Sequence, residues 1–303
     1  PSDDGDALAA QAAGDAVLVR SLSELRGPRL RVTLLDVGQG EAILVQLPNG
    51  KTLAVDGGPS DDGYADQLRD LGIDRLDYML LTHAHADHLS AAQHVRTALG
   101  GSIAIGRGVL DVQRTFKRIF GLDHSFAADG SDFDRLLADD ERLSLGQLQI
   151  EVLPVPGHTN DSVAYLVGDA LFVGDTIFMP DGGTARCDFP GGDAVALYRS
   201  VQRLYQLPPA TRVFVCHDYS PGGREPRCES SVADQLAANI HVREGVSEEA
   251  FVQMRRTRDA TLDVPNLLIP AVQVNIRAGK LPPPDADGVS YLRVPLNILG
   301  RPL

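Results

Sequence analysis

Three histidines and one aspartate lie within six residues of a chain that has only 8 histidines in 303 residues. Imidazole nitrogens and carboxylate oxygens are ligands that bind first-row transition metals. The segment directly follows the apolar run 78–81, YMLL, so we expect it on the loop at the carboxyl end of a strand, where α/β sheets place their sites. The sequence therefore predicts a metal site formed in part by His83, His85, Asp87 and His88.

Three further potential metal ligands each follow an apolar run: His158 follows LPVPG, Asp175 follows ALFVG and His217 follows VFVC. Taken singly, each residue has an ordinary interpretation, as a turn aspartate, a capping histidine or a buried hydrogen-bonded histidine. Together they repeat one pattern, because a sheet with these strands in parallel or mixed order brings all three to the same edge. We therefore expect them to complete the metal site. The remaining histidines are expected to be ordinary surface or core residues: His94, His124 and His241.

The elements that must position these residues alternate along the chain. The runs LRVTLLDV, EAILVQL and TLAVDGG, separated by Gly-rich turns, predict consecutive antiparallel strands. Apolar patterns predict later strands at 78–81, 102–105, 148–153, 163–167, 170–173 and 213–216, and helices at 64–71, 90–99, 193–206, 231–240 and 247–258. We expect residues 106–140 to be partly helical with a loop beside the active face, and the tail from Pro265 to be broken by prolines.

Composition and charge limit the class of protein. With 28 Lys+Arg, 41 Asp+Glu and 43% hydrophobic residues, the sequence is typical of a globular chain of net charge −13. Such an acidic surface repels phosphate backbones, so we expect no nucleic-acid partner. The 3 cysteines are too few for a disulfide scaffold, which favours a reducing compartment, the cytoplasm. No apolar run is long enough to span a bilayer, so we expect no membrane association.

Four short motifs resemble those of the metallo-β-lactamase superfamily: THAHADH at 82–88, PGHT at 156–159, GDT at 174–176 and CHDY at 216–219. The resemblance runs from about Leu30 to Tyr219 and implies an α/β fold, a four-layer αββα sandwich with a C-terminal extension. On this basis we expect a flexible lead-in at 1–28, a catalytic domain at 29–240 and an extension at 241–303 packed on the same domain. In the superfamily's dinuclear hydrolases, the matching positions hold one metal with His83, His85 and His158, and the other with Asp87, His88 and His217, bridged by Asp175.

A closer resemblance, from about His83 to the C-terminus, is to the persulfide dioxygenases, a group that includes ethylmalonic-encephalopathy-type enzymes and bacterial β-lactamase-like hydrolase proteins. The stretches FVGDTIFMPDGGTARCDFPGGD and VFVCHDYSPGGRE carry it. It implies one Fe(II) per chain, held by the positions of His83, His158 and Asp175, and oxidation of glutathione persulfide or a similar thiol persulfide with O2 to sulfite and thiol. Residues 30–88 instead resemble the metallo-β-lactamase-like domain of competence DNA-uptake proteins.

The leading hypothesis from the sequence is therefore an iron persulfide dioxygenase. The alternative is a dinuclear zinc hydrolase, such as a glyoxalase II-like thioesterase, a lactonase or a phosphodiesterase, in which Asp87 or Asp175 steadies the attacking water. A third hypothesis, a catalytically weak nucleic-acid-associated module, rests only on the competence-like residues, and the net charge of −13 counts against it. The sequence also leaves a homodimer open.

Three residues are candidates for substrate binding. Arg186 suits a carboxylate of glutathione, although an ion pair with Asp188 explains it equally well. Tyr219 and Arg224 closely follow His217 and either line the pocket or pack the loop. Cys216 is expected to be a small buried apolar residue rather than a nucleophile.

Overall fold

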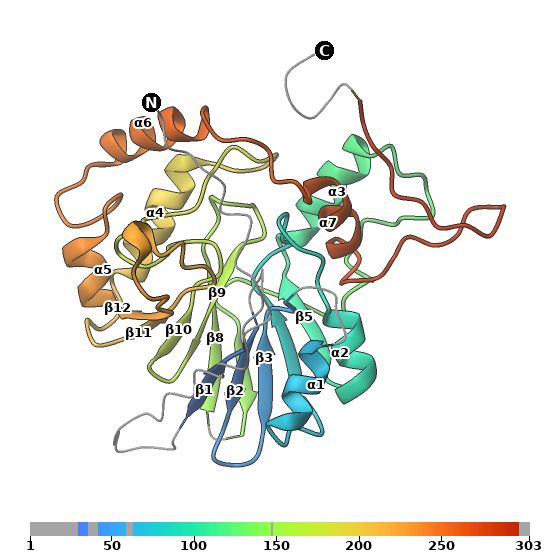
Figure 1. Ribbon diagram of the computed structural model, residues 1–303, viewed down its shortest axis with the longest axis horizontal. Coiled ribbons are helices and arrows are strands. Elements are labelled where there is room, and N and C mark those ends of the chain that lie inside the picture. Colours follow the sequence, from blue (N-terminus) through green and yellow to red (C-terminus); the bar gives the residue numbers. More distant parts are fainter. Residues whose placement is uncertain (1–29, 36–41, 59–62, 147, 297–303) are drawn as a thin grey trace.

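The computed structural model describes residues 30–35, 42–58, 63–146 and 148–296, and the predicted lead-in at 1–28 lies outside them. Two six-stranded sheets pack face to face, with helices on the outer side of each (Figure 1). This arrangement is the expected four-layer αββα sandwich.

The first sheet has the strand order β1-β2-β3-β4-β5-β6. Its first three strands form the predicted antiparallel meander, and β3 to β6 run parallel. The strands are β1 (Arg31–Leu34), β2 (Ile43–Gln46), β3 (Thr52–Val55), β4 (Tyr78–Leu81), β5 (Ser102–Gly106) and β6 (Arg135–Leu137).

The second sheet has the order β12-β11-β10-β9-β8-β7. Only β10 and β11 run parallel, and the other neighbours are antiparallel. The strands are β7 (Arg142–Leu145), β8 (Leu148–Pro154), β9 (Val163–Val167), β10 (Ala170–Phe172), β11 (Arg212–Phe214) and β12 (Glu229–Ser231).

Helices cover the outer face of each sheet. Buried side chains of α1 (Gly63–Asp70) and α2 (Ala92–Leu99) pack on the first sheet, and those of α4 (Ala194–Leu204) and α6 (Glu248–Asp259) pack on the second. Asp193 caps α4 by accepting the backbone N–H groups of Val195 and Ala196, which fixes the start of the helix. The remaining elements are α3 (Val109–Ile119), a short 3₁₀ turn η1 (Pro221–Gly223), α5 (Val232–Ala238) and α7 (Leu268–Asn275).

One of the three large apolar clusters lies between the two sheets. It includes fully buried residues of both, such as Ile43, Leu53 and Leu80 on one side and Tyr165 and Phe172 on the other. Burial on two faces explains why β2, β3 and β4 are almost continuously apolar rather than alternating. The sandwich is therefore a rigid base for the loops at its edge.

The tail departs from our expectation, because it contains the helix α7. Pro270 stands in the first turn of α7, where a missing backbone N–H costs no helical hydrogen bond. Buried residues of α7 and of α3 pack in one apolar cluster, and Gln113 donates to the carbonyl oxygen of Ile276. Ala278, just after α7, is buried in the apolar cluster of the first sheet, and the chain further on extends away from the sandwich (Figure 1).

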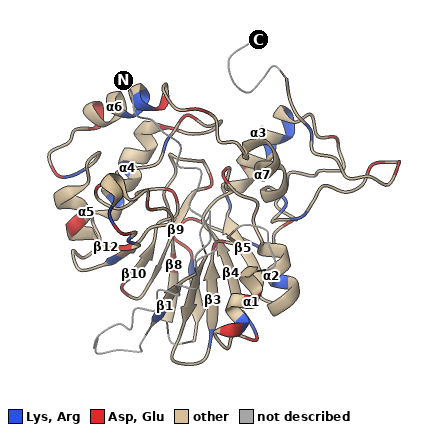
Figure 2. Cartoon of the chain, in the orientation of Figure 1, with Lys and Arg blue, Asp and Glu red and all other residues tan. Residues whose placement is uncertain are grey.

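The sequence prediction also missed the short strands β7 and β12 at the two edges of the second sheet. Helix α2 begins at Ala92 rather than Ser90, and residues 106–140 contain β6 as well as α3. Basic residues are spread over separate elements, including α2, α3 and α6 (Figure 2). Among the described residues, no helix is both long enough and apolar enough to cross a membrane.

Candidate metal centre

The predicted metal ligands come together at one edge of the sandwich, and the three ligands that we expected at the edge of one sheet do follow strands of a single sheet. His83 follows β4 of the first sheet, whereas His158, Asp175 and His217 follow β8, β10 and β11 of the second. The residues form three groups, in each of which the ligand atoms lie within 4.8 Å of one another, and Asp175 belongs to two of the groups. The loops of both sheets therefore build one centre.

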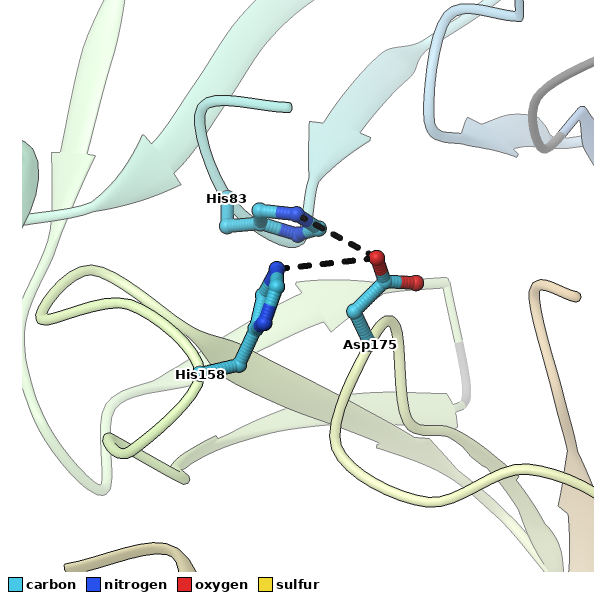
Figure 3. Close-up of side chains that lie close together, drawn as sticks. All are labelled: His83, His158 and Asp175. Atoms are coloured by element: carbon cyan, nitrogen blue, oxygen red, sulfur yellow. Dashed lines mark ion pairs between the residues drawn. The ribbon is translucent and has the colours of Figure 1, made fainter. Parts of the chain in front are cut away.

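Figure 3 shows the first group, in which His83 and His158 point toward the carboxylate of Asp175. The Nε2 atoms of His158 and His83 lie 3.6 Å and 3.9 Å from Asp175 Oδ2. The backbone carbonyl of Arg186 lies 2.8 Å from His158 Nδ1, so Nδ1 carries the proton and Nε2 keeps its lone pair. That lone pair faces the carboxylate, as a metal ligand requires.

The other oxygen of Asp175 faces a second group. His217 Nε2 lies 3.6 Å from Asp175 Oδ1 and 3.3 Å from Asp87 Oδ2. The thiol of Cys216 donates to the same Oδ1. Cys216 therefore contacts the centre and is half-buried, whereas we expected a small buried apolar residue.

A third group, His85, Asp87 and His88, is completed by an aspartate that sequence reasoning missed. Asp56 is fully buried, lies 3.0 Å from His85 Nε2 and accepts the backbone N–H of Thr82 at 2.8 Å. It has a left-handed backbone, with φ of 57°. The available signal was an acidic residue directly after the strand TLAV, in the turn DGG.

The C-terminal helix also supports the centre. Asn275 at the end of α7 donates to the carbonyl oxygens of His85 and His88, both at 2.8 Å, and accepts the N–H of Ser90 at 2.9 Å. On the other side of the loop, Asp161 accepts the N–H of Ala84 at 2.9 Å. These contacts hold the backbone of the histidine-rich loop, and no sequence pattern indicated either residue.

The protonation of the histidines is strongly unequal. Burial and then His85 lower the pKa of His83 well below its ordinary value and that of His88 to about 4. For His85, burial alone would lower the pKa, but Asp56 and the neighbouring carboxylates outweigh it and raise the pKa to about 9. For Asp87, burial is outweighed by His217 and the other histidines, so its pKa lies well below the ordinary value. At neutral pH the metal-free centre thus has neutral imidazoles at His83 and His88, a protonated His85 beside Asp56, and an ionised Asp87; a bound metal would displace the proton of His85.

The buried ring nitrogens of the histidines indicate whether a metal ion would fit this centre. Within the described part of the chain, His83 Nε2, His85 Nδ1 and both ring nitrogens of His88 are buried without a hydrogen-bond partner. Leaving such groups unsatisfied is costly, and a cation would satisfy them. The donor set of imidazoles and carboxylates suits zinc or iron. The residues present therefore fit a bound transition metal.

The predicted substrate-binding residues lie near this centre but are already paired. Arg186 makes a bidentate ion pair with Asp188, at 2.6 Å and 2.7 Å, and Arg224 makes one with Asp181 at the same distances. The ring of Tyr219, which is 70% exposed, lies 6.0 Å from that of His217. Substrate roles for Arg186, Arg224 and Tyr219 stay predictions.

Comparison with known proteins identifies the family. Residues 35–217 match the model of the metallo-beta-lactamase superfamily. The chain is 50% identical to a probable metallo-hydrolase of Burkholderia pseudomallei (88% of this chain, 94% of that protein) and 48% identical to glyoxylase B2 of Dictyostelium discoideum (74% and 77%). It is 49% identical over 74% of its length to a beta-lactamase hydrolase-like protein of Xylella fastidiosa, of which it spans about half (52%).

Among solved structures, the chain resembles ETHE1 from Myxococcus xanthus, with a TM-score of 0.66, 26% identity and coverage of 83% of this chain and all (100%) of that one. This match agrees with the predicted resemblance to persulfide dioxygenases, whereas the likeness of residues 30–88 to competence proteins stays a prediction. The buried histidines and aspartates, the αββα sandwich and the family match give one conclusion: the chain belongs to the metallo-β-lactamase superfamily and is a metal-dependent enzyme.

Proposed function

We propose that this enzyme is a hydrolase with two metal ions, acting on a thioester. One observation carries the proposal: the two oxygens of Asp175 face different groups of ligands. Oδ2 faces His83 and His158, whereas Oδ1 faces His217, which also contacts Asp87. A carboxylate shared in this way suits a bridge between two cations.

In this proposal, His83, His85 and His158 would hold one cation, and Asp87, His88 and His217 would hold the other, with Asp175 available to both. When bound, the cations supply Lewis acidity and lower the pKa of a coordinated water.

The chain's own residues orient the reactants. The pKa of Asp87 lies well below its ordinary value, so its carboxylate stays ionised and accepts a hydrogen bond from the attacking water. His158 is fixed through its contact with the Arg186 carbonyl. The rings of Phe178 and Tyr219 lie edge to face, 5.4 Å apart, and flank His217, and the exposed ring of Tyr219 offers an apolar surface for the acyl group.

The names of two relatives support a thioester as the substrate. A protein named glyoxylase is 48% identical, and a hydroxyacylglutathione hydrolase of Methylococcus capsulatus is 33% identical over 57% of this chain. These names support the hydrolase better than the dioxygenase that we ranked first from the sequence.

The iron persulfide dioxygenase is the second candidate, because of the His83, His158 and Asp175 group in Figure 3. All three residues are at most 9% exposed, and two imidazoles with one carboxylate suit a single non-haem iron. The likeness to ETHE1 also favours this candidate. Its substrates would be a thiol persulfide and O2, and iron would supply redox chemistry.

Metal content and turnover separate the two candidates. Protein reconstituted with zinc should hydrolyse an acyl-glutathione thioester and hold about two metals per chain. Protein with about one iron per chain that consumes O2 when glutathione persulfide is added, without thioester turnover, would overturn the hydrolase.

Two variants sharpen this comparison. His158→Ala should abolish either activity. His88→Ala should abolish hydrolysis by a two-metal centre but spare most of a one-iron dioxygenase, because only the former uses His88 as a ligand. A His88→Ala variant that retains full thioesterase activity would contradict the two-metal assignment.

A further inference from the structure

Cys216 is a half-buried thiol inside the metal centre, for which the superfamily ligand set described above has no role. Its Sγ donates to Asp175 Oδ1, the carboxylate oxygen that also faces His217. Residues 216 and 217 lie just after β11, one residue beyond its end at Phe214, so the same strand end delivers the thiol and the imidazole.

The ligand atoms of Asp175, Cys216 and His217 lie within 4.8 Å of one another. Donors around one cation lie slightly closer than this limit, since metal–sulfur and metal–nitrogen distances are about 2.3 Å and 2.0–2.1 Å, so small side-chain shifts would bring all three donors onto one cation. An independent sign of a ligand lies beside this group. His83 Nε2 is buried without a hydrogen bond and lies 3.9 Å from the other oxygen of Asp175.

The surrounding charge also favours a cation. The carboxylates of Asp87 and Asp175 both contact His217, and the carboxylate of Asp56 contacts His85. A thiolate alone would add a further negative charge to this cluster, at a high electrostatic cost. A divalent cation removes that cost and turns the thiol into a ligand.

We propose that Cys216 is a metal ligand, which holds a thiophilic divalent cation together with Asp175 and His217. On binding, the thiol proton is released to solvent and the sulfur lone pair bonds to the metal, so the net reaction is exchange of one proton for one coordination bond. A sulfur ligand selects zinc, cobalt or iron over magnesium and calcium. The inference rests on the metal centre of the proposed function but not on the reaction that the centre catalyses.

Cobalt reports directly on sulfur ligation. Protein stripped of metal and titrated with Co²⁺ should develop an intense near-ultraviolet thiolate-to-cobalt charge-transfer band. The band should be lost in Cys216→Ser and in Cys216→Ala, and it should remain in Cys228→Ser, which removes the other half-buried cysteine. The affinity for the last metal bound should fall about tenfold or more in both Cys216 variants.

A second measurement needs no variant. In the native protein, bound Zn²⁺ should protect Cys216 from alkylation, as measured by mass spectrometry, whereas the metal-free protein should be modified. No charge-transfer band in the native protein, a band that persists in Cys216→Ala, or alkylation that zinc does not slow would overturn the proposal. These outcomes are separate from the test of function, because a cobalt–sulfur band without thioester turnover would refute the hydrolase and retain the ligand.

Discussion

Replacing Asp56 by Asn should weaken the metal centre without touching a metal ligand. Asp56 is fully buried, contacts His85 Nε2 at 3.0 Å and accepts from the backbone and hydroxyl of Thr82 at 2.8 Å and 2.7 Å. Asn has nearly the same shape and tolerates the left-handed backbone at this position. The substitution therefore removes mainly the charge.

The magnitude follows from the histidine that Asp56 faces. Asp56 is the first of the carboxylates that together outweigh burial and raise the pKa of His85 from 6.5 to about 9. Breaking a buried ion pair by removing one partner costs about 3–5 kcal/mol. We expect metal-free Asp56→Asn to lose about 3 kcal/mol of unfolding free energy.

The loss of unfolding free energy in Asp56→Asn should depend on pH in a defined direction. Because the pKa of His85 is raised in the folded state, its contribution is fully present below pH 6.5 and is lost as the pH rises through about 9. The difference between native protein and Asp56→Asn should therefore shrink across this window. Urea unfolding of metal-free protein at several pH values measures it.

Metal affinity is the decisive assay for this variant. Asp56 orients His85, and loss of a group that orients a ligand typically costs about 10–100-fold in metal affinity. A competition titration against a chelator should show this loss. The matched control is Asp77→Asn, since Asp77 accepts from Lys51 and Thr52, at 2.9 Å and 3.0 Å, away from the centre. Unchanged metal affinity in Asp56→Asn, or an equal loss in the control, would refute the reasoning.

Three further perturbations test the fold and its link to the metal. Burial, followed by Arg255 and Arg258, lowers the pKa of His241 to about 4, so stability should fall as the pH drops from 6.5 toward 4. His241→Gln should flatten that fall and the exposed His124→Gln should not, and parallel urea midpoints in both would contradict this. Leu80→Ala, in the fully buried layer between the sheets, should cost about 2–5 kcal/mol in denaturant unfolding, and a loss below about 1 kcal/mol would show that the layer is loosely packed. Chelation should lower the melting temperature by several degrees, since a metal at about 1,000 times its Kd adds about 4 kcal/mol, and an unchanged melting curve would show that no metal was bound.

The sequence predicted most of the centre because its ligands carry local signals. Each of His158, Asp175 and His217 follows an apolar run, and in the structure each lies after a strand of the second sheet. These apolar runs did not indicate how the strands divide between the two sheets. His83 comes from the other sheet, so the centre depends on packing between sheets, which has no signature in short segments.

The supporting residues could not be found in the same way. Asn275 reaches the carbonyl oxygens of His85 and His88 from more than 180 positions away in sequence, with separations of 190 and 187. The proline in α7 argued against a helix there, but in the first turn it is tolerated. Our prediction for Cys216 used only the tendency of cysteine to be buried, whereas its proposed role depends on the nearby carboxylate of Asp175.

The metal content of protein purified without added metal tests the central claim most directly. The shared carboxylate of Asp175 and the buried ligand groups around it predict about two thiophilic metal ions per chain, zinc foremost, with both lost in protein that carries Asp175→Ala. About one iron per chain would contradict the two-metal hydrolase and favour the dioxygenase. A folded protein that holds no transition metal, and binds none when zinc or iron is supplied, would contradict the metal centre itself.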